Sequence, residues 1–220
     1  MTHPTQALHI PDTQSERDER HLAIQRVGVK DVRYPLRLRV AGAAQQTAAL
    51  WNLDVALPAE KKGTHMSRFV AWLDGLDAPL DAAVLRDKLG AMLTLLNASE
   101  GRIESRFSFF LRKRAPVSGV QSLLDYQGRW IAEARDGAVR LWSEVGVPVK
   151  SLCPCSKEIA DYGAHNQRSL VTLRVEQLQP IDWHELVRFA EDCASSEIWP
   201  LLKRPDEKWV TERAYDNPKF

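Results

Sequence analysis

Alternation of apolar and polar residues is the main structural signal in the first half of the chain. Residues 34–40 alternate apolar with basic side chains, and apolar residues recur at every second position over residues 47–57. A period of two predicts half-buried β-strands, and Gly42 between the segments favours an antiparallel hairpin. The same alternation predicts a third strand over residues 103–111.

Helical periodicity replaces this alternation over residues 80–96. Apolar residues there recur three and four positions apart, which predicts an amphipathic helix with Asp81 as its N-cap. A further helix is predicted over residues 180–193, with Asp182 in the same capping position.

The second half of the chain follows a similar order. Strands are predicted over residues 123–134 and 139–149, on either side of an Asp136-Gly137 turn, and again near residues 171–175. The order is strand, strand, helix, strand, followed by strand, strand, loop, strand, helix. It predicts an α+β fold of two similar modules, residues 21–119 and 120–220.

The two ends of the sequence differ from these modules. Residues 1–20 contain few apolar side chains, so we expect a flexible N-terminal arm. Asn217 and Pro218 resemble the cap and first position of a new helix. We therefore expect that the second module continues past Phe220 and that its C-terminal end is missing here.

Composition narrows the classes of function. The 220 residues carry 30 Lys and Arg against 29 Asp and Glu, a balance that argues against nucleic-acid binding. No apolar run is long enough to span a membrane, and no signal peptide is recognisable. The 3 cysteines form no disulfide framework, so we expect a protein of the reducing cytoplasm.

The densest group of reactive side chains follows the fifth predicted strand. Cys153, Cys155, Lys157, His165 and Arg168 fall within 16 residues. A thiolate and an imidazole are good ligands for zinc and similar ions, and three protein ligands would leave a position open for water. A buried cysteine pair beside an ordinary loop histidine explains the pattern almost as well, and a redox Cys-x-Cys motif is a third possibility.

Two other segments are weaker candidates. Residues 63–69 place His65, Ser67 and Arg68 after a glycine, which suits an anion contact, although a turn with packed apolar side chains is the simpler interpretation. The charge run at residues 203–208 resembles a solvated face, but Glu207 within it could complete a metal site. The tryptophans most simply fill the core or an interface.

These segments together resemble a known enzyme family. The strings LCPCSK (residues 152–157) and GAHNQRS (163–169) closely resemble those of the type IB GTP cyclohydrolase I family. So do GTHMSRF (63–69), KRPDEK (203–208) and the beginning of the chain from Val27 to Pro35. The resemblance covers the chain from about Asp18 to its end.

The resemblance implies a tunnelling fold of two modules and a homotetramer that converts GTP and water to 7,8-dihydroneopterin triphosphate and formate. It implies one divalent metal per site, zinc by preference with manganese or iron as alternatives, held by Cys153, His165 and Glu207. Cys153, His165 and His65 would be catalytic. The triphosphate would be bound by Ser67, Arg68, Lys157 and Arg168.

Two alternatives differ in kind from this enzyme. One is a tunnelling-fold nitrile reductase, which uses a cysteine nucleophile and a nicotinamide cofactor and should lack the histidine and glutamate ligands. The other is a scaffold that binds metal without turnover. The family also continues past Phe220 with a helix and a strand, and this agrees with the expectation of a missing end.

Overall fold

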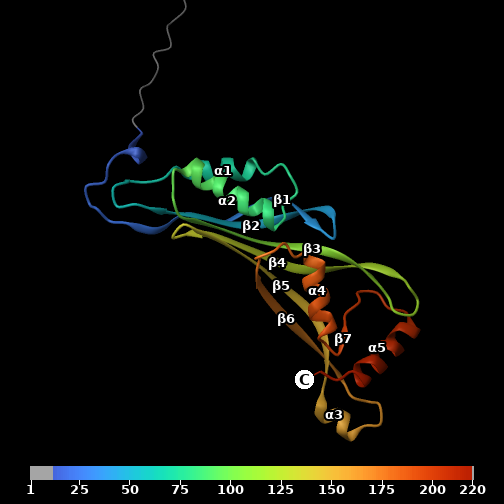
Figure 1. The fold of residues 1–220 in the computed structure, drawn as a ribbon. Helices are drawn as coiled ribbons and strands as arrows, with labels where there is room; N and C mark the ends of the chain where they lie inside the picture. Colours follow the sequence, from blue (N-terminus) through green and yellow to red (C-terminus); the bar gives the residue numbers. More distant parts are fainter. Residues whose placement is uncertain (1–11, 220) are drawn as a thin grey trace, which may run out of the picture.

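A seven-stranded antiparallel sheet organises the computed structural model, which describes residues 12–219 (Figure 1). Its strands run in the order β1-β2-β3-β4-β5-β6, and β7 pairs with β5. The bounds are β1 Ile24–Val40, β2 Ala43–Leu57, β3 Gly101–Arg114, β4 Gln121–Arg135, β5 Ala138–Leu152, β6 Asn166–Glu176 and β7 Ser196–Glu197.

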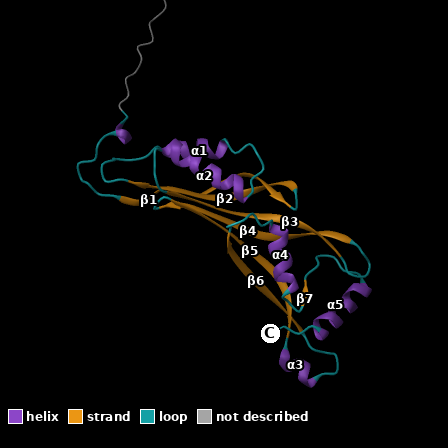
Figure 2. Ribbon diagram, in the orientation of Figure 1, coloured by secondary structure: helices purple, strands orange, loops and turns teal. Residues whose placement is uncertain are grey.

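The helices lie before, between and after these strands (Figure 2). They are the 3-10 helix η1 Thr13–Ser15 and the α-helices α1 Met66–Asp74, α2 Ala82–Leu96, α3 Pro154–Ile159, α4 Trp183–Asp192 and α5 Arg204–Asp216. The predicted α+β class is confirmed, and the open antiparallel sheet is consistent with a tunnelling fold.

Tight turns join neighbouring strands where the sequence predicts them. Ala41 and Gly42, between β1 and β2, both adopt positive φ, and so do Asp136 and Gly137 between β4 and β5. Two consecutive positive φ angles fit the turn whose twist matches that of a β-hairpin. Both predicted hairpins are confirmed.

One face of the sheet is dry and covered by helices. Alternate side chains of the strands form one buried cluster with the apolar sides of α1, α2 and α4. At its centre the rings of Phe107, Trp130 and Trp183 lie with their centroids 4.9, 5.3 and 5.4 Å apart. Such ring pairs add about 0.5–1.5 kcal/mol each beyond their burial. Helices thus lie on one face, as predicted.

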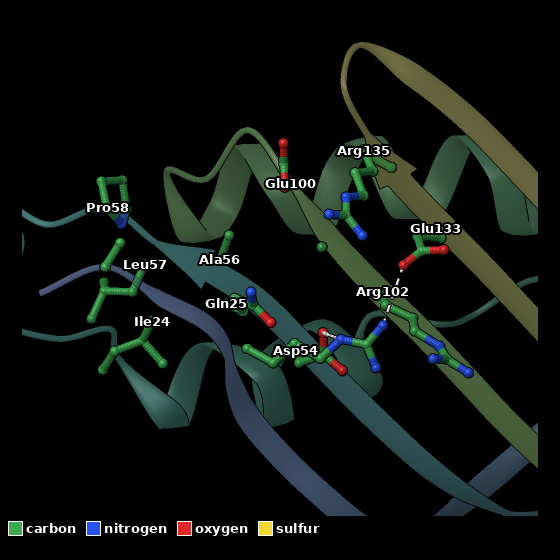
Figure 3. A pocket seen from close by; sticks show the side chains of 14 residues that line it. Ile24, Gln25, Asp54, Ala56, Leu57, Pro58, Glu100, Arg102, Glu133 and Arg135 are labelled. Atoms are coloured by element: carbon green, nitrogen blue, oxygen red, sulfur yellow. Dashed lines mark hydrogen bonds and ion pairs between the residues drawn. The ribbon is translucent and has the colours of Figure 1, made fainter.

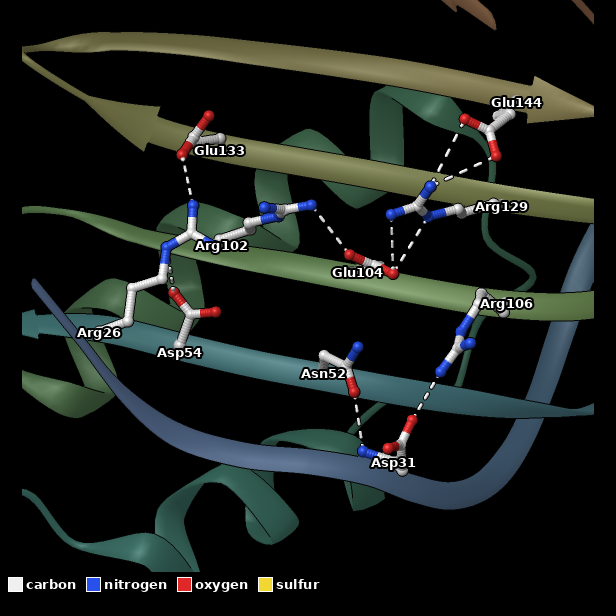
Figure 4. A network of polar contacts seen from close by, with 10 residues as sticks. All are labelled: Arg26, Asp31, Asn52, Asp54, Arg102, Glu104, Arg106, Arg129, Glu133 and Glu144. Carbon is white, nitrogen blue, oxygen red and sulfur yellow. Dashed lines mark hydrogen bonds and ion pairs between the residues drawn. The ribbon is translucent and has the colours of Figure 1, made fainter. Parts of the chain in front are cut away.

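The opposite face of the sheet carries charged side chains that pair across strands (Figure 4). Arg129 on β4 lies 3.0 Å from Glu104 on β3 and 3.3 Å from Glu144 on β5. We call this surface the charged face; its other ion pairs are Arg102–Glu104, Arg26–Asp54, Arg26–Glu133, Arg106–Asp31 and Arg140–Glu176. Because side chains alternate between faces, the strand register that buries the core also aligns these charges.

The helices α2 and α4 begin where the sequence predicts. The Asp81 carboxylate accepts a hydrogen bond from the N–H of Val84. Asp182 caps α4 within a capping box, and it also accepts the N–H of Ala41 from the first hairpin turn. Both predicted N-caps are confirmed, and the second one ties α4 to a distant loop.

Three helices lie where no helix was predicted. The segment interpreted as a turn at residues 63–69 leads into α1, whose buried Phe69, Trp72 and Leu73 have helical spacing. The predicted loop after β5 contains α3, and the charge run at residues 203–208 begins α5. These segments are short or highly charged, so their periodicity is weak.

α5 ends at Asp216. Asn217 is the C-cap of this helix, and its side-chain amide donates to the carbonyl oxygens of Ala194 and Ser195. The helix expected from Pro218 onward would extend past the described residues and stays a prediction.

A buried aspartate attaches the beginning of α5 to the loop between β3 and β4. The Asp206 side chain is fully buried and accepts the N–H groups of Val117 and Ser118 at 2.8 Å. It also accepts the Ser118 hydroxyl at 2.6 Å and the Lys203 N–H at 2.8 Å. These four hydrogen bonds fix the first turn of α5, where Glu207 lies.

The predicted module boundary at residues 119 and 120 falls in the loop between β3 and β4. These two strands pair along their whole length, so both halves share one sheet, and their division into two modules stays a prediction. Residues 1–11 of the predicted arm lie outside the described residues. The rest of the arm lies against the loop after β2, where the Asp18 N–H donates to the Glu60 carbonyl oxygen.

Substituting two glycines with alanine should change stability in opposite directions. A Cβ at Gly28 would meet the Leu53 carbonyl oxygen at 1.9 Å, whereas a Cβ at Gly90 would meet nothing within 4 Å. Gly90 is exposed in the middle of α2, so Gly90→Ala should stabilise the protein by about 1 kcal/mol. Gly28→Ala should destabilise it. Urea denaturation measures the free energy of unfolding of both variants. Equal changes of this free energy in the two variants would contradict the packing described here.

Asp206→Asn should lower the free energy of unfolding at neutral pH. The variant should also lose less of this free energy than the wild type as the pH falls. Burial raises the pKa of Asp206, but the donors of Ser118, Lys203 and Val117 outweigh it and hold the pKa well below its usual value. A depressed pKa gives stability above the unfolded-state pKa that is lost as pH falls toward the folded-state pKa. The measurement is urea denaturation from pH 7 down to about pH 3.

The exposed Asp192 provides the control for this experiment. Its carboxylate forms a long, exposed ion pair with Arg188, so Asp192→Asn should leave the pH profile close to that of the wild type. An Asp206→Asn profile that runs parallel to the wild type would show that the carboxylate charge is not part of the anchor.

Candidate functional site

The chain around α3 brings two predicted metal ligands together. Cys153 is the N-cap of α3, and Pro154 begins the helix. The Cys153 N–H donates to the carbonyl oxygen of His165 at 3.3 Å, and the His165 N–H donates to Ser156 Oγ at 3.3 Å. The segment from Cys153 to His165 therefore closes on itself, with α3 inside the loop.

The surroundings of Cys153 favour its thiolate form. Hydrogen bonds from the N–H and the hydroxyl of Ser156 hold the pKa of the Cys153 thiol below its usual value. The thiolate is the form that binds metals. Cys153 is half-buried and Cys155 is exposed. A thiolate and an exposed imidazole suit zinc and similar ions, so by donor chemistry these two residues fit the metal.

Glu207 lies away from this pair. Its carboxylate is exposed in the first turn of α5, 3.6 Å from the Arg204 guanidinium. α3 contacts the other end of α5, where Tyr215 lies about 12 Å further along the helix axis. Between residues 12 and 219, no three His, Cys, Asp or Glu side chains gather in a metal-binding arrangement.

Lys157 joins α3 to the end of α5. Its ammonium donates to the Tyr215 carbonyl oxygen at 2.8 Å and lies 4.7 Å from the centre of the Tyr215 ring. The Tyr162 ring lies 4.5 Å from that of Tyr215, and the Tyr162 hydroxyl donates to Asp216 at 3.0 Å. No motif in the sequence indicates these tyrosines, because their contacts join distant segments and leave no local pattern.

Arg168 lies on β6, directly opposite Lys150 on β5. Lys150 is therefore close in the sequence to Cys153, which follows β5, and Arg168 is close to His165, which precedes β6. The sequence motifs indicate Arg168 but not Lys150, because a single lysine within a strand carries no recognisable motif.

A second group of predicted residues lines a small cavity at the beginning of α1. The predicted residues His65 and Arg68 border this cavity of about 140 Å³, and so does Lys61, which was not predicted. The Arg68 guanidinium donates to the Leu95 carbonyl oxygen at 3.0 Å, and His65 Nε2 lies 3.4 Å from a carboxylate oxygen of Asp12. Ser67 is exposed on the first turn of α1.

The two groups lie at opposite ends of the sheet (Figure 1). The cavity near His65 adjoins the end of β2, which is level with Val139 near the start of β5. Cys153 follows Leu152 at the other end of β5. The strand from Val139 to Leu152 covers roughly 43 Å, so one chain cannot bring both groups to one small molecule.

Another cavity, of about 420 Å³, holds none of the predicted site residues (Figure 3). It lies near the start of β3, at the end of the charged face, and Arg26, Arg102 and Arg135 line it beside Asp54, Glu100 and Glu133. None of the helices between residues 12 and 219 has the length and apolarity that a membrane span requires.

Comparison with known proteins agrees with the sequence resemblance. The model of the family described as type I GTP cyclohydrolase folE2 matches residues 10–220. GTP cyclohydrolase FolE2 of Methylibium petroleiphilum is 63% identical over 100% of this chain and 86% of its own length. GTP cyclohydrolase FolE2 of Paraburkholderia phymatum is 58% identical over 100% of this chain and 82% of its own length. GTP cyclohydrolase FolE2 2 of Cupriavidus metallidurans is 59% identical over 97% of this chain and 80% of its own length. The chain therefore belongs to the type I GTP cyclohydrolase folE2 family.

Proposed function

We propose that this chain is an enzyme that converts GTP and water to 7,8-dihydroneopterin triphosphate and formate, the first step of folate and pterin biosynthesis. The observation that carries the proposal is the closed segment that joins Cys153 to His165, in a chain 63% identical to a protein named GTP cyclohydrolase FolE2. In this reaction water attacks C8 of guanine and the imidazole ring opens. A second hydrolysis then releases formate, and rearrangement of the ribose closes the pterin ring.

A divalent metal would be held by Cys153, His165 and Glu207, zinc by preference, with manganese and iron as alternatives. When bound, such an ion supplies Lewis acidity that lowers the pKa of water from 15.7 toward roughly 7. The lowered pKa of the Cys153 thiol and the exposure of His165 support their role as ligands. Glu207 lies apart from them in the first turn of α5, and its place among the ligands rests on the sequence resemblance.

The other predicted residues bind substrate or move protons. His65 would transfer protons during the later steps, with the neighbouring Asp12 carboxylate orienting its imidazole. Ser67, Arg68, Lys157 and Arg168 would bind the triphosphate, because cations and hydroxyl groups form strong hydrogen bonds to phosphate oxygens.

We propose a homotetramer, and the positions of these residues support an assembly of more than one copy. His65 and Arg68 lie at one end of the sheet and Cys153 at the other, roughly 43 Å along β5. A site that contains both groups needs two copies of the chain, with the α1 end of one copy beside the α3 end of the next. Closed symmetric assemblies satisfy this requirement for every copy.

Removing the thiol of Cys153 should abolish GTP turnover. Cys153→Ala removes a metal ligand but no buried core volume, so the variant should keep the wild-type assembly while formate release falls at least 100-fold. Formate and pterin fluorescence measure turnover, and metal analysis measures the bound ion. Cys155→Ala is the matched control.

A wild-type protein that binds metal and GTP but releases no formate would be a scaffold instead.

Mixing two inactive variants should restore activity. In mixed assemblies of His65→Ala and Cys153→Ala, some sites combine an intact α1 end with an intact α3 end from another copy. We expect about a quarter of the wild-type turnover after the two variants are unfolded and refolded together, if copies assemble at random. A mixture of His65→Ala with Arg68→Ala is the control and should stay inactive, since both changes damage the same end. No recovery in the first mixture would contradict a site shared between copies.

A further inference from the structure

The charged face neutralises its cations along most of its length. Arg129 lies between Glu104 and Glu144, and Arg26 lies between Asp54 and Glu133 (Figure 4). Like charges placed directly opposite each other across strands destabilise a sheet, whereas opposite charges stabilise it. This arrangement keeps many charged side chains on one surface without leaving strong repulsion among them.

Lys150 and Arg168 depart from this arrangement. The register pairs them directly, so two cations face each other on neighbouring strands. Val149 and Val147 point into the core, so Lys150 lies on the charged face, and Arg168 lies beside it. On its other side Lys150 is paired with Ser196 of β7, which carries no charge.

Neither cation has an ion pair among the residues that the structure describes. The nearest carboxylate on the charged face of β5 is Glu144, about 20 Å from Lys150 along the strand, and it contacts Arg129. The pKa of Lys150 is lowered, first by partial burial and then by the Arg168 charge. The cationic pair therefore costs stability unless an anion lies beside it.

The position of the pair points to the anion. Lys150 precedes Cys153 by about 10 Å along the chain direction, and Arg168 follows His165 by a similar length. An anion bound by both cations would thus lie within the length of a nucleoside triphosphate from the Cys153 and His165 segment.

We propose that Lys150 and Arg168 form a two-cation cradle for the triphosphate group of the nucleotide, with Lys150 as a substrate-binding residue that the sequence motifs do not reveal. The inference rests on the proposed function for the identity of the nucleotide. The need for an anion rests only on the geometry of the pair.

Lys150→Gln is the variant that tests the cradle, and inorganic triphosphate is the probe. The full-length variant should bind inorganic triphosphate about tenfold more weakly by calorimetry, because it loses one charge-assisted contact. It should also have a higher melting temperature in anion-free buffer, because the repulsion is gone. Its KM for GTP should rise about tenfold with kcat largely kept, while binding of guanosine stays unchanged.

Arg174→Gln is the matched control on the same face of β6. Arg174 is opposite Glu144 and lies 5.4 Å from the Trp142 ring. Arg174→Gln removes one positive charge, as Lys150→Gln does, but at a position where a carboxylate faces the cation. It should alter triphosphate affinity less than twofold, since exposed charges about 20 Å away are screened. Equal losses in the two variants would overturn the cradle and indicate a general effect of charge.

The remaining outcomes separate this inference from the proposed function. Wild-type affinity of Lys150→Gln for inorganic triphosphate, or a lower melting temperature in anion-free buffer, would overturn the cradle even if the enzyme turns over GTP. A weakened affinity with an unchanged KM for GTP would overturn the assignment to the substrate. A wild-type protein without GTP turnover, but with the predicted loss in Lys150→Gln, would refute the proposed function and support the cradle.

Discussion

The register of the antiparallel sheet is the constraint on which the rest of the structure depends. One alignment of β2 to β5 places Trp51, Trp130 and Val145 on the dry face and Glu104, Arg129 and Glu144 on the other. A shift of one residue in any strand would exchange these two sets. The burial of the core therefore also decides which charges meet on the charged face.

The length of the strands separates the two groups of candidate site residues. The strands β2 to β5 are 14 or 15 residues long, so the two ends of the sheet lie farther apart than the length of a nucleotide. Each end holds part of the candidate site: Cys153 with His165 at one, and His65 with Arg68 at the other. A long sheet is thus compatible with a small-molecule site when copies meet end to end, with the charged face free of helices between the ends.

The sequence predicted the parts of the fold that arise from local pattern. The hairpin turns at Gly42 and Gly137 and the caps Asp81 and Asp182 are local features, and all four are confirmed. α5 was missed although Pro205 with acidic residues after it is a helix-start signal, because its charges suggested a solvated face. The burial of Asp206 depends on a loop 89 residues away, and the pairing of Lys150 with Arg168 depends on the register between two strands. No local pattern contained either feature.

The order of the strands has a consequence for how the chain folds. From β1 to β6 each strand pairs with the next one in the sequence, so most pairing involves short loops and low contact order. The sheet can therefore grow from the N-terminus by adding strands to a free edge. The link from Asp206 to the β3–β4 loop spans 88 or 89 residues and can form only after the chain has returned from β7. Ordering of α5, and with it the position of Glu207, is accordingly a late event in folding.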